Sequence, residues 1–328
     1  MSAAGRGPVL KMADPPVLEA LRSAYGETLV ALGRENPDIV VLDCDLSSST
    51  QTALFGKAFP DRFFNMGIAE QNMMGVAAGL AASGKIPFAS SFAMFATGRP
   101  WEQIRQSVAL GRQNVKIVAT HAGVTTGEDG ASHQCLEDIA LMRILPHMTV
   151  IVPADSVETR QVIRKVAEHR GPCYVRLTRS KFPNVLDPDA YRFEIGRSRV
   201  VRDGKDLTII ACGLMVAHSL RAAAQLAREG IEARVVNLST VKPIDRELVM
   251  QCADETGRIL TVEEHFVAGG MGSAVAEVVV EARPVPMRIH GVRDRFGISG
   301  TSEELLRHFA LTPEHIAQEA RQLLKRRP

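Results

Sequence analysis

The chain has 328 residues, 45% of them hydrophobic, which is enough for two domains that each bury a core. Its 39 basic and 37 acidic side chains give a formal net charge of +2, a balance that supports neither nucleic acid nor an anionic membrane as a partner. No window is apolar for long enough to cross a bilayer, and five scattered cysteines without a CxxC pair indicate reduced thiols in a cytoplasmic protein.

Residues 1–11 are predicted to form a flexible tail, because the N-terminal segment MSAAGRGPVLKMADPP has no long apolar run. Beyond this tail, helical and strand-like patterns alternate to the end of the chain. Helices are predicted over 16–35, 68–83, 155–170, 214–229 and 302–326. Strands are predicted over 39–43, 85–90, 115–120, 149–153, 173–177, 207–212, 232–238, 258–263 and 285–292.

Most of these strand segments are apolar on both faces, as is typical of parallel strands covered by helices. The alternation therefore predicts an α/β protein with two doubly wound domains and mainly parallel sheets. The segment KFPNVLDPDAY, residues 181–191, combines two prolines with three Asn or Asp residues and has no periodicity, which indicates a linker. We therefore expect a first domain over 12–185 and a second over 186–328.

Polar and aromatic side chains follow several strands of the first domain at the point where each strand ends. In open parallel sheets, ligand sites form outside the carboxyl ends of the strands. The residues at these ends are Asp43, Asp45, Ser91, Phe92, His121, Asp155 and Arg179. Because loops are polar in any case, this pattern alone does not separate a site from an ordinary surface.

One carboxylate, Glu70 in the segment NMGIAEQN (65–72), enters a helix whose remainder, MMGVAAGLAASG, is almost entirely apolar and small. In one interpretation, Glu70 complements the helix macrodipole, with Asn65 as a candidate cap. In the other, Glu70 lies in a pocket of low dielectric that can hold its carboxyl group neutral for acid–base work. Met73 and Met74 follow it and could line such a pocket.

Two further strand ends carry groups that suit a ligand. Phe92 and Phe95 either fill the core or present a face on which a flat heterocycle can stack. Arg179 ends the strand-like run CYVRLTR, where a guanidinium is suited to bidentate phosphate binding, although a surface arginine in the linker would have the same pattern.

The loop AGVTTGEDGASHQ, residues 122–134, contains three glycines, two acids and a histidine. Glycines allow unusual backbone angles and close approach to a ligand. Asp129 and His133 could hydrogen-bond the vicinal hydroxyls of a sugar, and His121 could face the same space. A Ser–His–Asp triad is disfavoured because nothing here resembles a nucleophile elbow, and a metal site has no recognisable ligand spacing.

Taken in order, GIAEQN, SSFAMF, HAGVTTGEDGASHQ and LTR resemble the pyrimidine-binding domain of transketolase, an enzyme dependent on thiamine diphosphate. The later segments KPIDRE (242–247), TVEEH (261–265) and GGMG (269–272) resemble that family's C-terminal domain, so the resemblance extends over residues 20–328. The order of several motifs makes this match more specific than any single motif. It implies transfer of a two-carbon ketol unit from a ketose phosphate to an aldose phosphate.

The resemblance also implies a role for each matching residue. Glu70 would activate the aminopyrimidine ring of the cofactor, and Phe92 and Phe95 would form the wall against which this ring stacks. Asp45 would lie near the thiazolium ring. The residues implied to bind the sugar substrate are Arg22, Ser49, His121, Asp129, His133 and Arg179. The two histidines among them would also assist proton transfers, while the second domain would support assembly without touching the cofactor.

The chain departs from the family pattern in two places. Several relatives carry a third aromatic residue where this chain has Gly98, and Trp101 is the aromatic side chain that could substitute. A complete transketolase also begins with a domain whose GDG motif and downstream Asn bind the divalent metal and the diphosphate, and no GDG occurs here. We therefore expect a separate N-terminal subunit with a GDG motif to hold the diphosphate and Mg²⁺ or Ca²⁺, in an α2β2 heterotetramer. This chain itself would carry no metal ligands.

Three alternatives remain open. Two are related thiamine enzymes, a 1-deoxyxylulose-5-phosphate synthase and the β subunit of a 2-oxo-acid dehydrogenase, and the third is a non-catalytic scaffold with the same fold. The segments GEDGASHQ and LTR favour sugar phosphates over the first two alternatives. Retention of Glu70, Asp129, His133 and Arg179 in one chain disfavours the scaffold.

Overall fold

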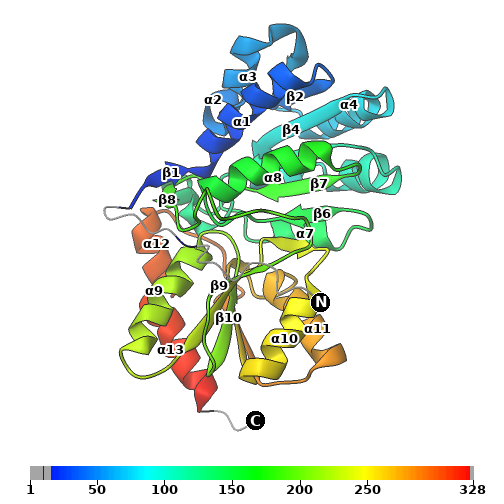
Figure 1. The fold of residues 1–328 in the computed structure, drawn as a ribbon. Helices are drawn as coiled ribbons and strands as arrows, with labels where there is room; N and C mark the ends of the chain where they lie inside the picture. The colour runs from blue at the N-terminus through cyan, green and yellow to red at the C-terminus, as the bar shows by residue number, and fades with distance from the viewer. Residues whose placement is uncertain (1–9, 11–15, 326–328) are drawn as a thin grey trace.

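The computed structural model describes Leu10 and residues 16–325. Two mainly parallel sheets, each covered by helices on both faces, lie one above the other in Figure 1. This confirms the predicted α/β class with mainly parallel sheets. The predicted tail over residues 1–11 lies outside the described residues except for Leu10, which forms an antiparallel bridge to Leu186.

The upper sheet has seven strands in the order β12-β6-β7-β5-β4-β2-β3, and all pairs except β12–β6 are parallel. The strands are β2 (Ile39–Asp43), β3 (Phe63–Asn65), β4 (Ile86–Phe92), β5 (Lys116–Thr120), β6 (Thr149–Ile151), β7 (Cys173–Arg176) and β12 (Thr240–Lys242). Packed against it are α1 (Leu21–Glu35), α4 (Glu70–Ala82), the π-helical segment η2 (Ile104–Leu110) and α8 (Ser156–Glu168). Short helices complete this half: α2 (Ser47–Thr50), α3 (Ala53–Ala58), η1 (Pro60–Arg62), α5 (Ala93–Thr97), α6 (Trp101–Gln103), η3 (Val124–Asp129) and α7 (Asp138–Arg143).

The lower sheet has five strands in the order β14-β13-β10-β11-β9, of which only β9 runs antiparallel to its neighbour. The strands are β9 (Arg199–Arg202), β10 (Leu207–Ala211), β11 (Ala233–Asn237), β13 (Ile259–Phe266) and β14 (Met287–Val292). One face is covered by α9 (Met215–Ala227) and α13 (Pro313–Leu324), and the other by α10 (Arg246–Thr256) and α11 (Met271–Ala282) (Figure 1). The helix α12 (Ser302–His308) packs against η3 of the upper half.

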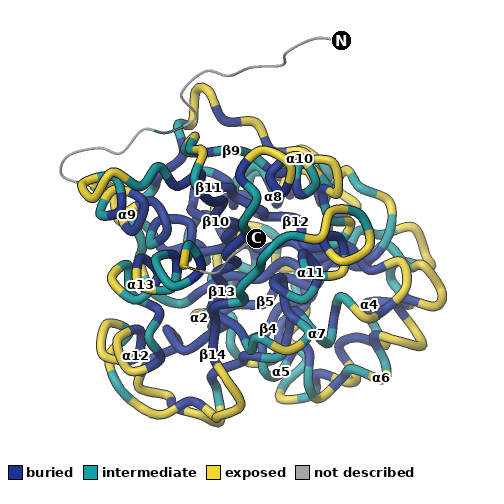
Figure 2. The backbone as a smooth tube through the Cα atoms, turned by 90° about the horizontal axis from the view of Figure 1, so that it is seen from below, coloured by how far each residue is buried: buried dark blue, intermediate teal, exposed yellow. Residues whose placement is uncertain are grey.

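Alternate residues of each central strand point into two different cores. In β2, Val41 belongs to the core that contains α1 and α8, whereas Val40 and Leu42 belong to the core that contains α4. Both cores continue into the lower half, the first through α9 and α13 and the second through α10 and α11. The strands are therefore buried on both faces, as Figure 2 shows by their dark blue colour at the centre of the molecule.

The structure corrects two of the predicted helices. The segment 302–326 forms two helices, because Ala310 has a left-handed φ of 58° and Pro313 begins the second helix, where its missing N–H costs nothing. The helix predicted to begin at residue 16 begins at Leu21, since residues Leu18–Ala20 form strand β1 and pair with β8 (Lys181–Pro183).

The predicted linker over 181–191 is an ordered connection rather than a loose one. It begins with β8, and Val185 and Leu186 are buried with their backbone N–H groups both donating to Asp155 Oδ2 at 2.8 Å. The lower half also returns to the upper sheet, because β12 pairs with β6 as an edge strand. Both links tie the two halves together close to the carboxyl ends of the upper strands.

Candidate active site

The carboxyl ends of β2, β4 and β5 lie side by side because these strands are neighbours in the parallel sheet. Asp45 follows β2, Phe92 ends β4, and His121 follows β5. Asp45 and His121 have left-handed φ values of 62° and 58°, which are uncommon for residues other than glycine. Such backbone conformations are concentrated at functional sites, where the surrounding structure holds them in place.

Two phenylalanines and two histidines form one aromatic cluster at this edge. The ring of Phe92 is stacked on His121, with centroids 3.7 Å apart and planes inclined by 19°. Phe92 and Phe95 are also nearly parallel, with centroids 6.0 Å apart, and the ring of His133 meets Phe95 edge-on at 5.2 Å. The structure thus brings together four residues that the sequence predicted for the site but that come from three separate segments.

His121 is buried and is surrounded by positive charge. Its Nδ1 lies 2.9 Å from the Thr120 hydroxyl, and its backbone carbonyl accepts a hydrogen bond from Thr126 Oγ1 at 2.6 Å. Burial, reinforced by Arg22, Arg179 and His133, lowers the pKa of His121 to about 3. The imidazole is therefore neutral at physiological pH and can both donate and accept hydrogen bonds.

Two guanidinium groups lie near this cluster. Arg22 in α1 donates from Nη1 to the Ser49 carbonyl oxygen at 2.9 Å, and burial together with the neighbouring Arg179 lowers the pKa of Arg22. Arg179 donates from Nη1 to the Thr126 carbonyl at 2.6 Å and pairs with the exposed Glu128 carboxylate at 2.8 Å. Two neighbouring guanidinium groups at this edge of the sheet can form charge-assisted hydrogen bonds to a phosphate group.

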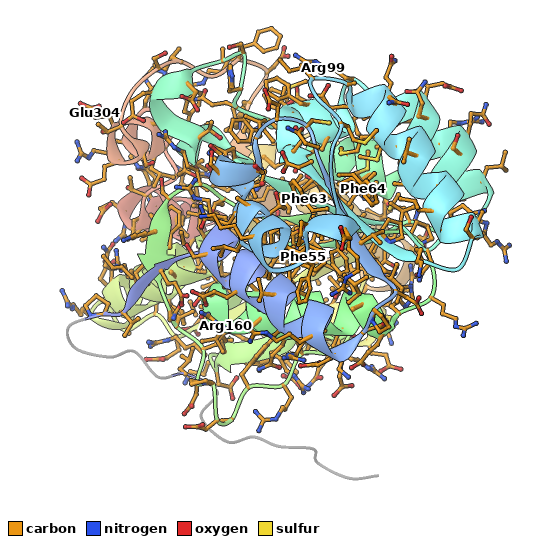
Figure 3. All side chains as sticks on the ribbon, turned by 90° about the horizontal axis from the view of Figure 1, so that it is seen from above. Phe55, Phe63, Phe64, Arg99, Arg160 and Glu304 are labelled. Carbon is orange, nitrogen blue, oxygen red and sulfur yellow. The ribbon has the colours of Figure 1, made fainter. Side chains whose placement is uncertain are left out.

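Glu70 is the first residue of α4 and is only 3% exposed. Arg99 Nη1 donates to its two carboxylate oxygens, at 3.0 Å to Oε1 and 3.1 Å to Oε2. The predicted cap Asn65 does not bond to this helix, since its side-chain oxygen accepts from the N–H groups of Asp45 and Gly67. Glu70 therefore both begins the helix and lies buried, and Arg99, which is at the periphery in Figure 3, is its charge partner.

A cation lies over the Phe95 ring, one residue after the position of the missing third aromatic residue. The guanidinium carbon of Arg99 lies over the Phe95 ring, 4.3 Å from its centroid. Trp101, the predicted substitute, instead donates from Nε1 to the Leu141 carbonyl at 3.0 Å and packs against the core that contains α4. The turn after Gly98 thus brings the Arg99 guanidinium to the Phe95 ring, and the substitution by Trp101 stays a prediction.

The loop 122–134 is held from the lower half of the molecule. Glu264 at the end of β13 accepts a hydrogen bond on Oε1 from the Thr125 N–H at 2.6 Å, and Ser302 donates to the Thr125 carbonyl at 3.1 Å. Gly123 has a φ of 84°, and a Cβ atom there would lie 2.2 Å from the Glu264 carboxyl carbon, so only glycine fits. At the far end of the loop, Asp129 is exposed, and its predicted contact with substrate stays a prediction.

Replacing Glu264 by glutamine is expected to flatten the pH dependence of stability. Burial raises the pKa of Glu264 to about 7, above its value of about 4.3 in an unfolded chain. Its contribution to stability is therefore full at low pH and is lost as the pH rises through 7. The melting temperature of Glu264→Gln, measured between pH 5 and 8, should fall less steeply with pH than that of the wild type.

The matched control for this experiment is Glu303→Gln, which removes an exposed carboxylate from α12 and should leave the wild-type slope intact. Glu263, whose pKa burial also raises to about 7, remains in both proteins and accounts for part of the slope that persists. Identical slopes for Glu264→Gln and the wild type would contradict the assignment.

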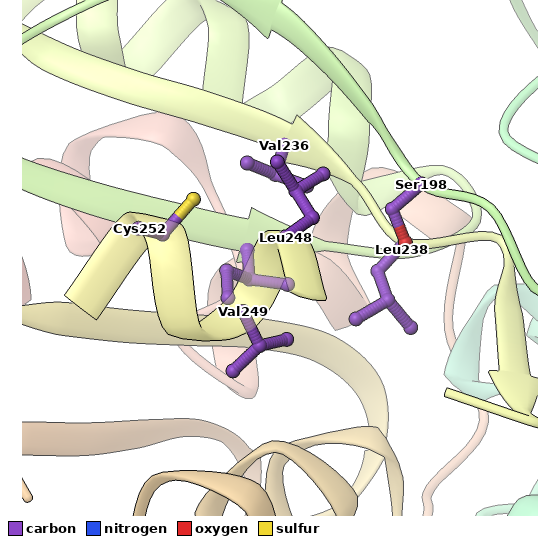
Figure 4. Close-up of a pocket in the computed structure, with 7 residues that line it drawn as sticks. Ser198, Val236, Leu238, Leu248, Val249 and Cys252 are labelled. Carbon is purple, nitrogen blue, oxygen red and sulfur yellow. The ribbon is translucent and has the colours of Figure 1, made fainter. Parts of the chain in front are cut away.

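Two hollows of the molecule lie away from this edge. A groove of about 900 Å³ lies at the opposite, amino-terminal ends of the upper strands, between Asp38, Asn114 and Pro172. A second pocket, in the lower half beside α10, has about 150 Å³ of empty space and no room for a water molecule (Figure 4). Within residues 16–325, no helix is long and apolar enough to span a membrane, and no three His, Cys, Asp or Glu side chains converge as metal ligands.

The sequence motifs did not indicate Arg99 and Glu264, and the strand-end residues Asp43 and Asp155 have structural roles. Arg99 could have been noticed four residues after Phe95, whereas nothing in the sequence places Glu264 beside Thr125. Asp43 accepts hydrogen bonds from Thr50 and Thr52, and Asp155 caps α8. The carboxylates of Asp43 and Asp155 therefore accept hydrogen bonds that stabilise the local structure.

Comparison with known proteins shows the family of the chain. The transketolase pyrimidine-binding domain model matches residues 19–184, and the transketolase C-terminal domain model matches residues 196–316. A putative transketolase C-terminal section of Methanocaldococcus jannaschii is 51% identical over 313 residues, which cover 94% of this chain and 98% of that protein. A 6-deoxy-6-sulfo-D-fructose transketolase subunit of a Clostridium species is 42% identical over 308 residues, or 94% of this chain and 95% of that subunit.

A solved structure, described as a split gene transketolase in an inactive beta4 tetramer, is also similar. It superimposes with a TM-score of 0.87 at 56% sequence identity, covering 93% of this chain and 98% of that chain. The chain therefore belongs to the transketolase family and corresponds to its C-terminal half, a pyrimidine-binding domain followed by the transketolase C-terminal domain.

Proposed function

We propose that this chain is the C-terminal subunit of a transketolase that transfers a two-carbon ketol unit from a ketose phosphate to an aldose phosphate. The observation that carries this proposal is the convergence at one sheet edge of a buried carboxylate, an aromatic wall, a neutral histidine and two guanidinium groups. These are the groups needed to hold a flat heterocycle beside a phosphorylated sugar.

The residues fit the pyrimidine half of thiamine diphosphate. The guanidinium of Arg99, a planar group with N–H donors, lies over the Phe95 ring while it donates to Glu70, so these two side chains offer a ring face and a hydrogen-bond acceptor side by side. When bound, thiamine diphosphate supplies the nucleophilic carbon and the electron sink for cleaving and forming the carbon–carbon bond. Glu70 would hold a proton at the pyrimidine ring nitrogen, and Phe92 and Phe95 would orient the ring.

The remaining residues of the edge would act on the sugar. His121 and His133 would exchange hydrogen bonds and protons with its hydroxyls, and Asp129 would bind a further hydroxyl. Arg22 and Arg179, with Ser49 beside them, would hold the phosphate. Asp45, tied to Asn65 by a hydrogen bond of 3.2 Å, would stand near the thiazolium ring.

The diphosphate and Mg²⁺ or Ca²⁺ would be held by a separate N-terminal subunit that carries the GDG motif, in an α2β2 complex. This part of the proposal is supported by the similar solved structure, which is described as a split gene transketolase. It is also supported by the Methanocaldococcus jannaschii relative, which is a C-terminal section of similar extent.

Reconstitution tests the proposed function. The purified chain should show no ketol transfer by itself and should gain it when mixed with the N-terminal subunit, thiamine diphosphate and Mg²⁺. Xylulose 5-phosphate as donor and ribose 5-phosphate as acceptor provide the assay. Turnover by the chain without a partner, or none with the partner across several sugar phosphates, would overturn the proposal.

Replacing Arg179 by alanine is expected to raise the KM for phosphorylated sugars about tenfold or more, because a charge-assisted hydrogen bond to phosphate is lost. The KM for the corresponding unphosphorylated sugars should change little. Arg164→Ala, which removes an exposed arginine paired with Glu35 far from the site, is the matched control. Equal effects of Arg179→Ala on both kinds of sugar would exclude it as a phosphate ligand.

A further inference from the structure

Arg99 makes the two contacts that the proposed function assigns to the pyrimidine ring of the cofactor. We propose that its guanidinium competes with this ring for the subsite between Glu70 and Phe95, and that the side chain must swing out before the ring binds. The inference rests on the proposed function, because it requires a flat cofactor ring at Glu70. It adds a gate residue that has no other role in the proposed chemistry.

The guanidinium of Arg99 contacts an aromatic face and a carboxylate at the same time. On one side, the guanidinium lies 4.3 Å from the Phe95 centroid, a distance at which a cation is attracted to an aromatic face. At its edge, Nη1 donates to both oxygens of Glu70, at 3.0 and 3.1 Å. A protonated pyrimidine ring nitrogen would need the same carboxylate and the same aromatic wall, so both groups cannot be seated together.

The backbone around Arg99 is fixed, which leaves its side chain as the movable part. Arg99 lies in the short turn between α5 and α6, where its carbonyl accepts a hydrogen bond from Gln71 Nε2 at 3.4 Å. Gly98 is packed so closely that a Cβ atom would lie 2.8 Å from the Met94 carbonyl oxygen. The side chain of Arg99 is 50% exposed, whereas that of Glu70 is 3% exposed, so the guanidinium can leave into solvent without moving the turn.

The ion pair between Arg99 and Glu70 bears on the proposed role of Glu70. Arg99 Nη1 donates to both carboxylate oxygens of Glu70, whereas the proposed role of Glu70 is to share a proton with the ring. Arg99 therefore keeps the buried carboxylate satisfied and unreactive until the ring replaces it. A buried carboxylate without a partner at this position would destabilise the fold, and the ion pair with Arg99 offsets this destabilisation.

The test is the affinity of the reconstituted complex for thiamine diphosphate in the presence of Mg²⁺, measured by titration calorimetry. Arg99→Ala should lower the Kd about fivefold, which corresponds to loss of a competing ion pair that is half exposed to solvent. Arg164→Ala removes a similarly exposed arginine from its glutamate and should leave the Kd unchanged. Thermal melting of each variant confirms that it is folded.

A double-variant cycle shows whether the effect passes through Glu70. In the Glu70→Gln background, Arg99→Ala should no longer tighten binding, because the ion pair is already gone. An unchanged or weaker affinity of Arg99→Ala, or a tightening that persists in the Glu70→Gln background, would overturn the inference while the proposed function stands. Absence of any thiamine diphosphate binding by the wild-type complex would instead overturn both.

Discussion

Replacing Glu70 by glutamine in the reconstituted enzyme is expected to lower kcat by about 10²-fold or more, the size of a lost acid–base group. Glutamine has nearly the same shape, but it cannot carry or release a proton at the pyrimidine nitrogen. Because Glu70 is 3% exposed at the start of α4, water cannot easily take over its role. The measurement is the steady-state rate of ketol transfer at saturating cofactor.

A glutamate-to-glutamine change at an exposed position shows whether the loss of kcat is specific to Glu70. Glu102→Gln, in the neighbouring helix α6, alters a carboxylate that accepts a hydrogen bond from the side chain of Gln103, and it should keep the wild-type rate. Retention of near-normal turnover by Glu70→Gln would remove Glu70 from the proposed mechanism. A cofactor affinity measured in parallel shows whether binding, and not proton transfer, has been lost.

Replacing Arg176 by methionine is expected to destabilise the fold by about 3–5 kcal/mol, the cost of removing one partner of a buried ion pair. Arg176 donates from Nε to Asp138 at 2.8 Å, and their side chains are 3% and 0% exposed. Its Nη2 also donates to the carbonyl of Glu264 at 2.9 Å, which joins the two halves of the molecule. Methionine fills similar space but leaves the Asp138 carboxylate without its cation.

Urea unfolding measures this loss, and two further variants calibrate it. Arg164→Met breaks the exposed pair with Glu35 and should cost less than about 1 kcal/mol. The double variant Arg176→Met, Asp138→Leu should recover part of the loss, because no buried charge is left unpaired. A cost of Arg176→Met no larger than that of Arg164→Met would show that this pair does not hold the fold.

The family resemblance implied that the second domain supports assembly without touching the cofactor. In the structure, the lower half of the molecule also holds the loop 122–134. Glu264 and Ser302 bond to Thr125, and Gln134 bonds to the Ile298 carbonyl at 2.9 Å, so this half fixes the loop that carries His133. Both hydrophobic cores also run through both halves. A substitution at the contacts between the two halves should therefore alter the loop 122–134 as well as the stability of the fold.

The central strands and the helices α1, α4, α8 and α9 could be predicted from their burial pattern or end signals, whereas α10 and α11 were not among the predicted helices. The runs over 39–43 and 207–212 contain continuous β-branched residues, and Pro313 marks a helix start that the prediction of one helix over 302–326 overlooked. The short strands β1, β8 and β12 carry no such signal. Each exists only because a distant segment offers its edge for pairing.

By itself, the sequence determined the alternating α/β pattern, the order of the motifs, and hence the residues Glu70, Phe92, His121 and Arg179 that gather at one sheet edge. Their proximity could be predicted from the sequence because the carboxyl ends of parallel strands lie at the same edge of a sheet. Only the tertiary structure decided that Arg99 lies between Glu70 and Phe95 and that Glu264 holds Thr125. Those contacts depend on side-chain direction and on packing across 139 residues of chain, which no local pattern encodes.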